Sequence, residues 1–293
     1  MVTLAFSTNA YTKFALPDAC DRIAAAGYAA VEVLADAPHA WPPTYSDHQA
    51  RRLKERLDSL GLRCVAVNAN TAMGYFKPLP AALTFEPSLV SPDEVQRQDR
   101  VAIYRQAIAL ANRLGAPVVT LTAGRPSDLA ALGLPIDPPG VLRERLLDGL
   151  EPILAAADLA GVDLALEAEP GQLIETVADV RALLEEVDHP RFGANLDVGH
   201  AWCAGDDPAQ AVHLLARRLK HLHLEDIKDR RHYHLIPGLG EIDFQAIRRA
   251  LDEVGYAGAA AVELYTYQDS PDRAAAEAHA VLAPLFPQPR GAR

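Results

Sequence analysis

The chain has 293 residues, of which 49% are hydrophobic and 23% are charged, a balance typical of a globular protein that buries a full core. Its formal net charge of −11 and the lack of a basic block argue against nucleic acid as a partner. Three widely spaced cysteines, an N-terminus unlike a signal peptide and no apolar run long enough to span a membrane predict a protein of the reducing cytoplasm, with no membrane partner.

A helix-like segment that runs into glycine and then into a short apolar strand occurs five times along the chain. The copies are "AAAGYAAVEV", "DSLGLRCVAV", "NRLGAPVVTL", "DLAGVDLALE" and "DEVGYAGAAAVEL". Glycine stands where the end of a helix needs a left-handed residue, at Gly27, Gly61, Gly115, Gly161 and Gly255. The apolar run that follows each glycine has the length of a strand, so the pattern predicts a repeated α-to-β connection.

Eight strands are predicted, near 3–8, 29–35, 63–69, 117–122, 162–168, 192–198, 219–225 and 259–265. Two helix starts resemble capping boxes, "SDHQ" from Ser46 and "SPDE" from Ser91, the second with Pro92 at the first helical position. Alternating β and α units predict a (β/α)8 TIM barrel, a single domain over residues 1–286, and a disordered tail over 287–293. A doubly wound open sheet is the alternative, but no strand is followed by a glycine-rich dinucleotide fingerprint.

One predicted connection is unusually long. After the third strand the chain runs "NANTAMGYFKPLPAALTFEPSLV", and a loop of this length in a compact domain is typically functional or a lid. Asn68, at its start, is a candidate for contact with substrate. Tyr75 and Phe76 in this loop, together with Trp202, could form an apolar wall over a ligand or could be ordinary packing residues.

Polar side chains gather at the ends of the last four barrel strands, where TIM barrels carry their chemistry. Alternation along a strand turns Leu164 and Leu166 toward the outer helices, and it turns Glu167 inward. The same reasoning on the next three strands turns one residue inward near each strand end. These residues are Asp197, His223 and Glu263.

Each of these residues also has an ordinary structural reading. An inward Glu can pair with a basic residue, His223 can be a hydrogen-bonded core histidine, and Asp197 can cap the following turn. Together they favour a metal, because the strands carry no basic residue to neutralise three carboxylates. A divalent cation suits three carboxylate oxygens and one imidazole. Glu169 could be a third acid–base group at this site, although a solvated charge at the rim is favoured.

At these residues the chain resembles the xylose isomerase-like TIM-barrel superfamily, in particular its sugar phosphate isomerase/epimerase family, over essentially its whole length. The motifs are "LALEAEPG", "NLDVGH", "HLHLED", "IPGLGEIDF" and "VELY". The resemblance implies that Glu167, Asp197, His223 and Glu263 hold one divalent metal, for which we favour Mn²⁺ over Mg²⁺, Co²⁺ and Zn²⁺. It also implies that His200 meets the substrate.

The resemblance implies a metal-dependent isomerase or epimerase that acts on a sugar, sugar phosphate or polyol through an enediolate, with Glu167 and Glu263 as acid–base groups. A dehydratase of the inosose or 3-dehydroshikimate type is the alternative. An AP-endonuclease-like hydrolase is less favoured, since strand ends three and four lack that branch's metal-binding histidines. A non-catalytic metabolite-binding subunit and assembly into a homo-oligomer remain open.

The stretch "KHLHLEDIKDRRHYHLIPGLG" holds four of the ten histidines. His221 is expected deeper in the barrel than His223, with a hydrogen-bond partner. His232 and His234 are expected on a loop over the mouth, pointing the same way, with Tyr233 turned away from them. "HYH" is similar to the Asp-x-His pair of the endonuclease branch, so the two histidines could bind a second metal, could lie on the surface without a role, or could contact substrate. We favour the last use, with His234 as the residue.

Overall fold

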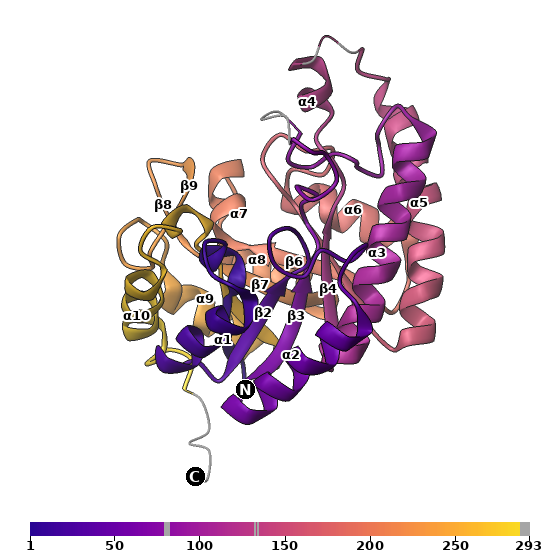
Figure 1. Ribbon diagram of the computed structural model, residues 1–293. Coiled ribbons are helices and arrows are strands. Elements are labelled where there is room, and N and C mark those ends of the chain that lie inside the picture. Colours follow the sequence, from indigo (N-terminus) through magenta and orange to yellow (C-terminus); the bar gives the residue numbers. More distant parts are fainter. Residues whose placement is uncertain (79–82, 132, 134, 288–293) are drawn as a thin grey trace.

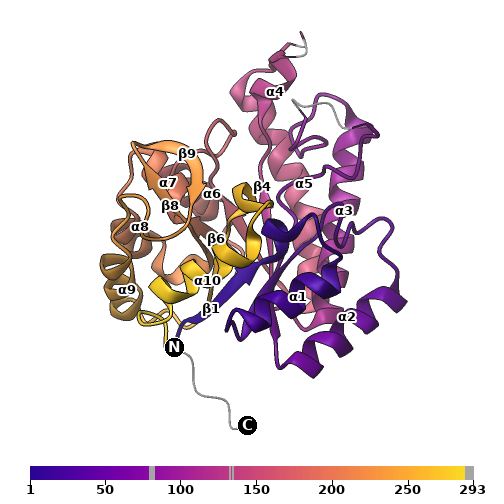
Figure 2. The ribbon, with the colours of Figure 1, turned by 60° about the vertical axis from the view of Figure 1, so that its left-hand side comes forward.

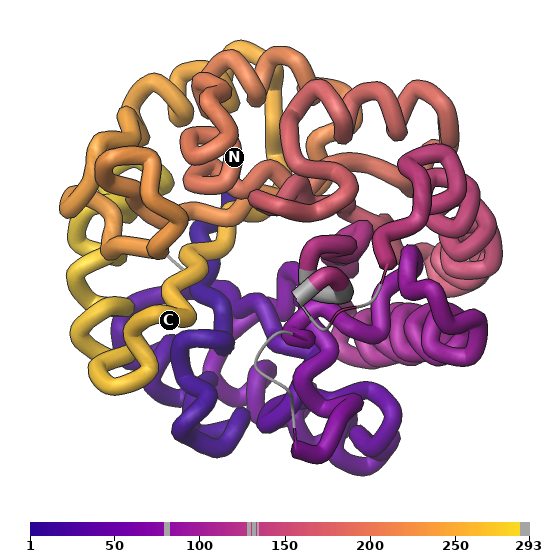
Figure 3. The backbone as a smooth tube through the Cα atoms, turned by 90° about the horizontal axis from the view of Figure 1, so that it is seen from above, coloured from indigo at the N-terminus to yellow at the C-terminus, as the bar shows by residue number. Residues whose placement is uncertain are grey.

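The computed structural model describes residues 1–78, 83–131, 133 and 135–287. In this part of the chain, parallel strands close into an eight-stranded barrel in the order β1, β10, β7, β6, β5, β4, β3, β2, and helices surround it (Figures 1 and 3). The strands are β1 (Thr3–Ser7), β2 (Ala30–Leu34), β3 (Arg63–Asn68), β4 (Val118–Thr122), β5 (Asp163–Glu167), β6 (Phe192–Asp197), β7 (Leu219–Leu224) and β10 (Ala259–Val262).

The helices follow the strands in the alternation that a TIM barrel requires. They are α1 (Leu16–Ala25), α2 (Asp47–Leu60), α3 (Glu94–Leu114), α4 (Pro126–Ala131), α5 (Pro139–Ala160), α6 (Val177–Val187), α7 (Val198–Ala204), α8 (Pro208–Leu215), α9 (Phe244–Glu253) and α10 (Pro271–Leu282). Of the described helices, none is both long and apolar enough to cross a membrane.

The predicted (β/α)8 barrel is confirmed. The strand expected near 259–265 ends at Val262, and the bounds of the other seven strands agree with the prediction to within one residue. An open doubly wound sheet is wrong, because β1 pairs with both β2 and β10 and so leaves no free edge. Residues 288–293 of the expected tail lie outside the described residues.

The helix ends explain why the repeated phrase could be read from the sequence. All five predicted glycines have a positive φ. This backbone conformation is unfavourable for residues that carry a Cβ atom, but not for glycine. The capping box at Ser46 is confirmed by reciprocal hydrogen bonds with Gln49. The one expected at Ser91 is wrong, because α3 begins later and Asp93 caps it by accepting from the Val95 amide. The Ser91 hydroxyl instead donates to the buried Glu86 carboxylate.

The interior of the barrel combines small apolar side chains with polar ones. Ala5, Ala30, Val65, Ala259 and Ala261 form an apolar cluster. Strand register places Ala261 beside His223, which also pairs with Asp197 on its other side. The polar groups of the strand ends are therefore buried next to small apolar side chains.

The long connection after β3, the segment that carries α4 and the chain after β7 rise above the mouth (Figures 1 and 2). The long connection after β3 is tied down by Arg100, a buried arginine of α3 that donates to the carbonyl oxygens of Ala69, Asn70 and Thr71. After β7 the chain forms an antiparallel hairpin of β8 (Asp226–Lys228) and β9 (Arg231–Leu235), where an extended loop over the mouth was expected.

Candidate active site

A cavity of about 670 Å³ opens at the C-terminal ends of the barrel strands. The predicted residues Asn68, Glu167, Glu169, His200 and Glu263 line it. The sequence prediction that the strand ends deliver polar groups to one place is therefore matched by the geometry.

The four residues predicted as metal ligands lie together, and two of them, Glu167 and Glu263, line this cavity. One ligand atom from each of Glu167, Asp197, His223 and Glu263 lies within 4.8 Å of the others, and all four residues are buried. The Nδ1 atom of His223 is 3.0 Å from a Glu167 oxygen, 3.7 Å from a Glu263 oxygen and 3.8 Å from an Asp197 oxygen. We call this set the four-residue cluster.

The donor chemistry of the four-residue cluster fits a divalent cation. Three carboxylates in one buried place repel one another unless a proton or a cation lies among them. Burial raises the pKa of Glu263 to about 8; His223 opposes this rise and Glu167 adds to it. For Glu167, burial is outweighed by His223 and His200, which lower its pKa. A divalent cation would keep both carboxylates ionised, and three oxygens with one imidazole suit such an ion.

A carboxylate that the sequence analysis did not single out lies directly below. Glu32 on β2 is fully buried, and one of its oxygens is 2.9 Å from the Nε2 atoms of both His221 and His223. Because a carboxylate only accepts, Nε2 of His223 carries a proton toward Glu32, and Nδ1 is the atom that faces the four-residue cluster and would bind a cation there. His221 lies deeper and is hydrogen-bonded, as expected. Alternation along "AVEVL" also turns Glu32 inward, so the pattern used for the last four strands would have found it.

Replacing Glu32 by glutamine is expected to weaken metal binding at the four-residue cluster by about 10- to 100-fold, because the acceptor that orients His223 loses its charge. The measurement is Mn²⁺ affinity from the free-ion signal in electron paramagnetic resonance. Glu86→Gln is the matched control, since Glu86 is equally buried but contacts Ser88 and Ser91 in the connection after β3. An unchanged Mn²⁺ affinity in Glu32→Gln would show that Glu32 does not orient the ligand.

Four amides hold the two cavity-facing glutamates in place. The side-chain nitrogens of Asn9 and Asn68 each lie 2.9 Å from the same oxygen of Glu263. Asn70 donates to Glu167 at 2.9 Å, and Asn195 donates to the same oxygen of Glu167. One oxygen of each carboxylate is therefore restrained. In Glu263 the other oxygen faces His223 Nδ1, whereas in Glu167 the restrained oxygen itself lies 3.0 Å from that atom and the other oxygen lies 3.2 Å from His200 Nδ1. Asn68, predicted to contact substrate, lines the cavity, but its side-chain nitrogen donates to Glu263 and to Glu32.

A further carboxyl group, that of Glu225 in the motif "HLHLED", lies beside Asp197. Glu225 is fully buried, and burial together with Asp197 raises its pKa well above the ordinary range. A Cβ at position 199 would lie 2.2 Å from a Glu225 oxygen, so only glycine fits there, and the Gly199 amide donates to that oxygen. The raised pKa of Glu225 favours its neutral form, which avoids a second negative charge next to Asp197.

Glu169 is not a solvated rim charge. Only 6% of it is exposed, and one of its oxygens is 3.2 Å from Arg125, whose guanidinium lies 4.3 Å from the Phe85 ring centre. Burial raises the pKa of Glu169 to about 7, and Arg125 and His200 oppose the rise. Glu169 is covered because the chain just beyond β4 brings Arg125 against its carboxylate.

The expected apolar wall comes from other residues. Trp202, Tyr75 and Phe76 do not line the described cavity, whereas Phe85 and Tyr265 do. Trp202 packs beneath Arg230, and Tyr75 donates its hydroxyl proton to Asp99. Aromatic residues alone carry no periodic signal in the sequence that distinguishes a cavity wall from packing.

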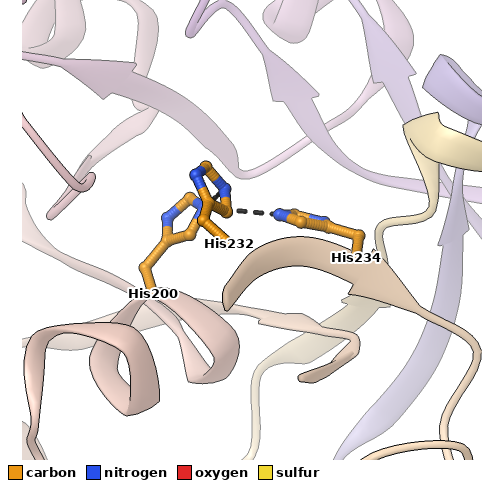
Figure 4. Close-up of side chains that lie close together, drawn as sticks. All are labelled: His200, His232 and His234. Carbon is orange, nitrogen blue, oxygen red and sulfur yellow. Dashed lines mark hydrogen bonds between the residues drawn. The ribbon is translucent and has the colours of Figure 1, made fainter. Parts of the chain in front are cut away.

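The histidines of the mouth have distinct positions (Figure 4). Burial lowers the pKa of His200, but Asp197, Glu169 and Glu167 outweigh it and raise the value to about 10. His232 lines the cavity. His234 is fully buried, with Nδ1 2.8 Å from the carbonyl oxygen of Glu263, and it is not among the residues that line the described cavity. Tyr233 turns outward with 54% exposed, as the alternation predicted.

Comparison with known proteins identifies the family. A family model described as "Xylose isomerase-like TIM barrel" matches residues 20–285. The chain belongs to this family. The resemblance seen in the strand-end motifs is thereby confirmed.

Individual relatives of this xylose isomerase-like barrel include an epimerase. The chain is 24% identical over 266 residues to fructoselysine 3-epimerase of Shigella flexneri, and the matched region covers 89% of this chain and 90% of that protein. Among solved structures, a D-tagatose 3-epimerase-like protein matches with a TM-score of 0.78 at 23% identity, over 97% of both chains. A protein called IOLI, described with a binding zinc atom, matches with a TM-score of 0.75 at 18% identity, over 97% of this chain and 98% of that one. At these identities the structural matches establish the fold.

Proposed function

We propose that the chain is a divalent-metal-dependent isomerase or epimerase that acts on a sugar or other polyol at a carbon next to a carbonyl group. The observation that carries the proposal is the pair Glu167 and Glu263, which share the four-residue cluster and line the cavity, each with one oxygen restrained by amides. The similarity to fructoselysine 3-epimerase supports an activity on sugars.

The residues that would hold the cation are Glu167, Asp197, His223 and Glu263. A divalent ion bound there supplies positive charge that polarises a carbonyl group and stabilises negative charge as it develops on the oxygen. We favour Mn²⁺ because the donor set is rich in oxygen, while the zinc atom described for IOLI makes Zn²⁺ the alternative.

The chain's own carboxylates would move the proton. With substrate between them, Glu167 and Glu263 can each reach a carbon–hydrogen bond next to the carbonyl group. If one removes the proton and the other returns it to the opposite face, the carbon is inverted, which is epimerisation. If the same carboxylate returns the proton to the adjacent carbon, the outcome is isomerisation. If a β-hydroxyl group leaves instead, the outcome is dehydration.

Neighbouring residues would bind and orient the polyol. His200 and Glu169 line the cavity beside the four-residue cluster and are suited to hydrogen bonds with hydroxyl groups. Phe85 and Tyr265 supply apolar surface for the carbon skeleton. The partner proposed for this site is therefore a small polyhydroxylated molecule, and the acidic composition argues against nucleic acid.

The test is proton exchange. Metal-loaded protein incubated in D₂O with a panel of ketoses and keto-polyols is expected to incorporate deuterium at the carbon next to the carbonyl group of its substrate, detected by NMR. An enzyme that removes a proton from carbon must show this exchange or convert the substrate to its epimer or isomer. Phosphodiester hydrolysis and simple binding require neither. Conversion of a phosphodiester substrate without exchange in any polyol would refute the proposal, and loss of water from the substrate would select the dehydratase alternative.

A further inference from the structure

One wall of the cavity is aliphatic, in contrast to the carboxylates and amides at the strand ends. Leu34 ends β2, Ala37 and Pro38 follow it, and Met73 belongs to the long connection after β3. All four residues line the cavity, and we call this set the aliphatic shelf. Since β2 and β3 are neighbours in the barrel, with Leu34 paired to Asn68, the two loops that carry the shelf start side by side.

The carboxylate of Asp36 ties these two loops together. Asp36 is fully buried and accepts from the Ala37 amide of its own loop at 2.7 Å. It also accepts from the Met73 and Gly74 amides of the other loop, at 2.7 Å and 2.9 Å. A Cβ at position 74 would lie 2.6 Å from the Trp41 ring, so the backbone beside Met73 is packed closely on this ring. The protein's own contacts therefore fix the backbone of the aliphatic shelf.

The aliphatic shelf presents apolar surface that folding does not bury. Met73 is 43% exposed although its backbone is fixed, and Pro38 is exposed as well. Exposed apolar side chains in a groove typically mark the place of an apolar ligand group. A hydroxyl group matches such a surface poorly, because it would lose water without gaining a hydrogen bond. The shelf therefore suits a part of the ligand that carries no hydroxyl groups.

The cavity has room for such a part in addition to a polyol. Its volume of about 670 Å³ lies within the range of sites that enclose drug-sized ligands. Its polar end, at Glu167 and Glu263, takes the hydroxyl groups and the reacting carbon. The four shelf residues are uncharged, and the carboxylate of Asp36 is occupied by the amides it accepts from. Lys13 also lines the cavity, but its ammonium group is paired with Asp269. These features favour an uncharged group on the shelf.

We propose that the substrate is a conjugate, in which a sugar or other polyol reacts between Glu167 and Glu263 and carries an uncharged apolar substituent that lies on the aliphatic shelf. An ether, glycosidic or amine linkage would join the two parts. The inference rests on the proposed function and narrows its substrate class. A free ketose fills only the polar end of the cavity, so it binds more weakly than the conjugate.

The test uses ligands that bind without reacting. The methyl and n-butyl ethers of D-mannitol at O1 carry no carbonyl group. The two ends of D-mannitol are equivalent, so one ether tests a substituent at either end of the polyol. A fully buried methylene strengthens binding roughly fourfold, and the butyl ether adds three methylenes that the shelf covers on one side. Wild-type protein loaded with Mg²⁺ is therefore expected to bind the butyl ether about 10-fold more tightly than the methyl ether in calorimetry.

Methionine methyl groups report where the butyl group lies. The chain has two methionines, Met73 on the shelf and Met1, which precedes β1 and so lies at the opposite end of the barrel from the cavity. In protein labelled with ¹³C at the methionine methyl groups, the butyl ether is expected to shift the Met73 signal and to leave the Met1 signal unchanged. Met73→Leu identifies which signal belongs to the shelf.

Variants of the shelf should lose the preference for the butyl ether. Met73→Ser removes an apolar side chain and Ala37→Asp adds a charge, so each is expected to bring the two affinities close to equality. Val281→Ser is the matched control and should keep the wild-type ratio. Val281 on α10 is similarly exposed, at 40%, but is not among the residues that line the described cavity.

Equal affinities of the two ethers for wild-type protein, with an unmoved Met73 signal, would overturn the inference. Proton exchange into a free ketose in the same preparation would then leave the proposed function intact. Conversely, a preserved preference for the butyl ether without proton exchange in any polyol would refute the proposed reaction and keep the shelf as a binding site. The two failures are distinguishable because the ethers bind without reacting.

Discussion

Asp197→Asn is expected to remove the cation of the four-residue cluster and to lower turnover by about three orders of magnitude, with the barrel still folded. Electrostatic assistance from a metal contributes several kcal/mol to such reactions, and each 1.36 kcal/mol is tenfold in rate. Asparagine is uncharged, so it binds a hard cation weakly. It remains a good helix N-cap, however, and Asp197 caps α7 by accepting from the His200 amide at 2.6 Å.

The measurements are Mn²⁺ content, turnover and the free energy of unfolding in urea. Asp207→Asn is the matched control, because Asp207 caps α8 in the same way but lies on the surface. His223→Ala should lose metal as Asp197→Asn does. Full activity of wild-type protein in EDTA, or normal Mn²⁺ content in Asp197→Asn, would contradict the assignment of these residues as ligands.

Glu167→Gln and Glu263→Gln are each expected to lower turnover by roughly two to four orders of magnitude, as loss of a general base does. Glutamine keeps an oxygen for the cation and keeps the volume of the side chain, but it cannot accept a proton from carbon. The assays are run at saturating Mn²⁺, with metal content measured in the same samples. Glu277→Gln, on the exposed side of α10, is the control.

Deuterium exchange separates the roles of the two carboxylates. In a two-base epimerase each variant should still exchange the proton of one epimer, since the remaining carboxylate can remove it, and should lose exchange with the other. Loss of exchange with both epimers in one variant only would identify a single base and favour isomerisation. Near-normal turnover in either variant with metal bound would rule out the two-carboxylate scheme.

The helix ends and the inward faces of the strands could be predicted from the sequence, because both depend on residues that are close together in the chain. A helix must end in a left-handed residue before a strand can start, which placed the glycines, and inward and outward side chains alternate along each strand. These local rules predicted the barrel and the set Glu167, Asp197, His223 and Glu263. The error at Ser91 shows their limit, because its hydroxyl found a better partner in Glu86 than in a helix amide.

The supporting contacts could not be read in this way, because they join residues that are distant in the chain. Glu32 meets His223 across 191 positions, and Asn9 meets Glu263 across 254 positions. Only closure of the barrel makes β1 a neighbour of β10 and brings the inward side chains of β2 within reach of those of β7. A pattern within one strand predicts that a side chain points inward, but it does not predict which side chain lies opposite.

The sequence by itself determined the fold, the edge of the barrel that carries chemistry and the residue types that meet there, since each follows from local backbone preference and strand alternation. Tertiary structure alone decided which histidines converge. Hairpin pairing of β8 with β9 folds His232 and His234 back onto His200 at the end of β6, and that pairing depends on the Asp226 carboxylate and the amides it collects from the following turn. The tertiary structure also decided that Glu169 is buried, because the chain segment that covers this side chain follows a different strand.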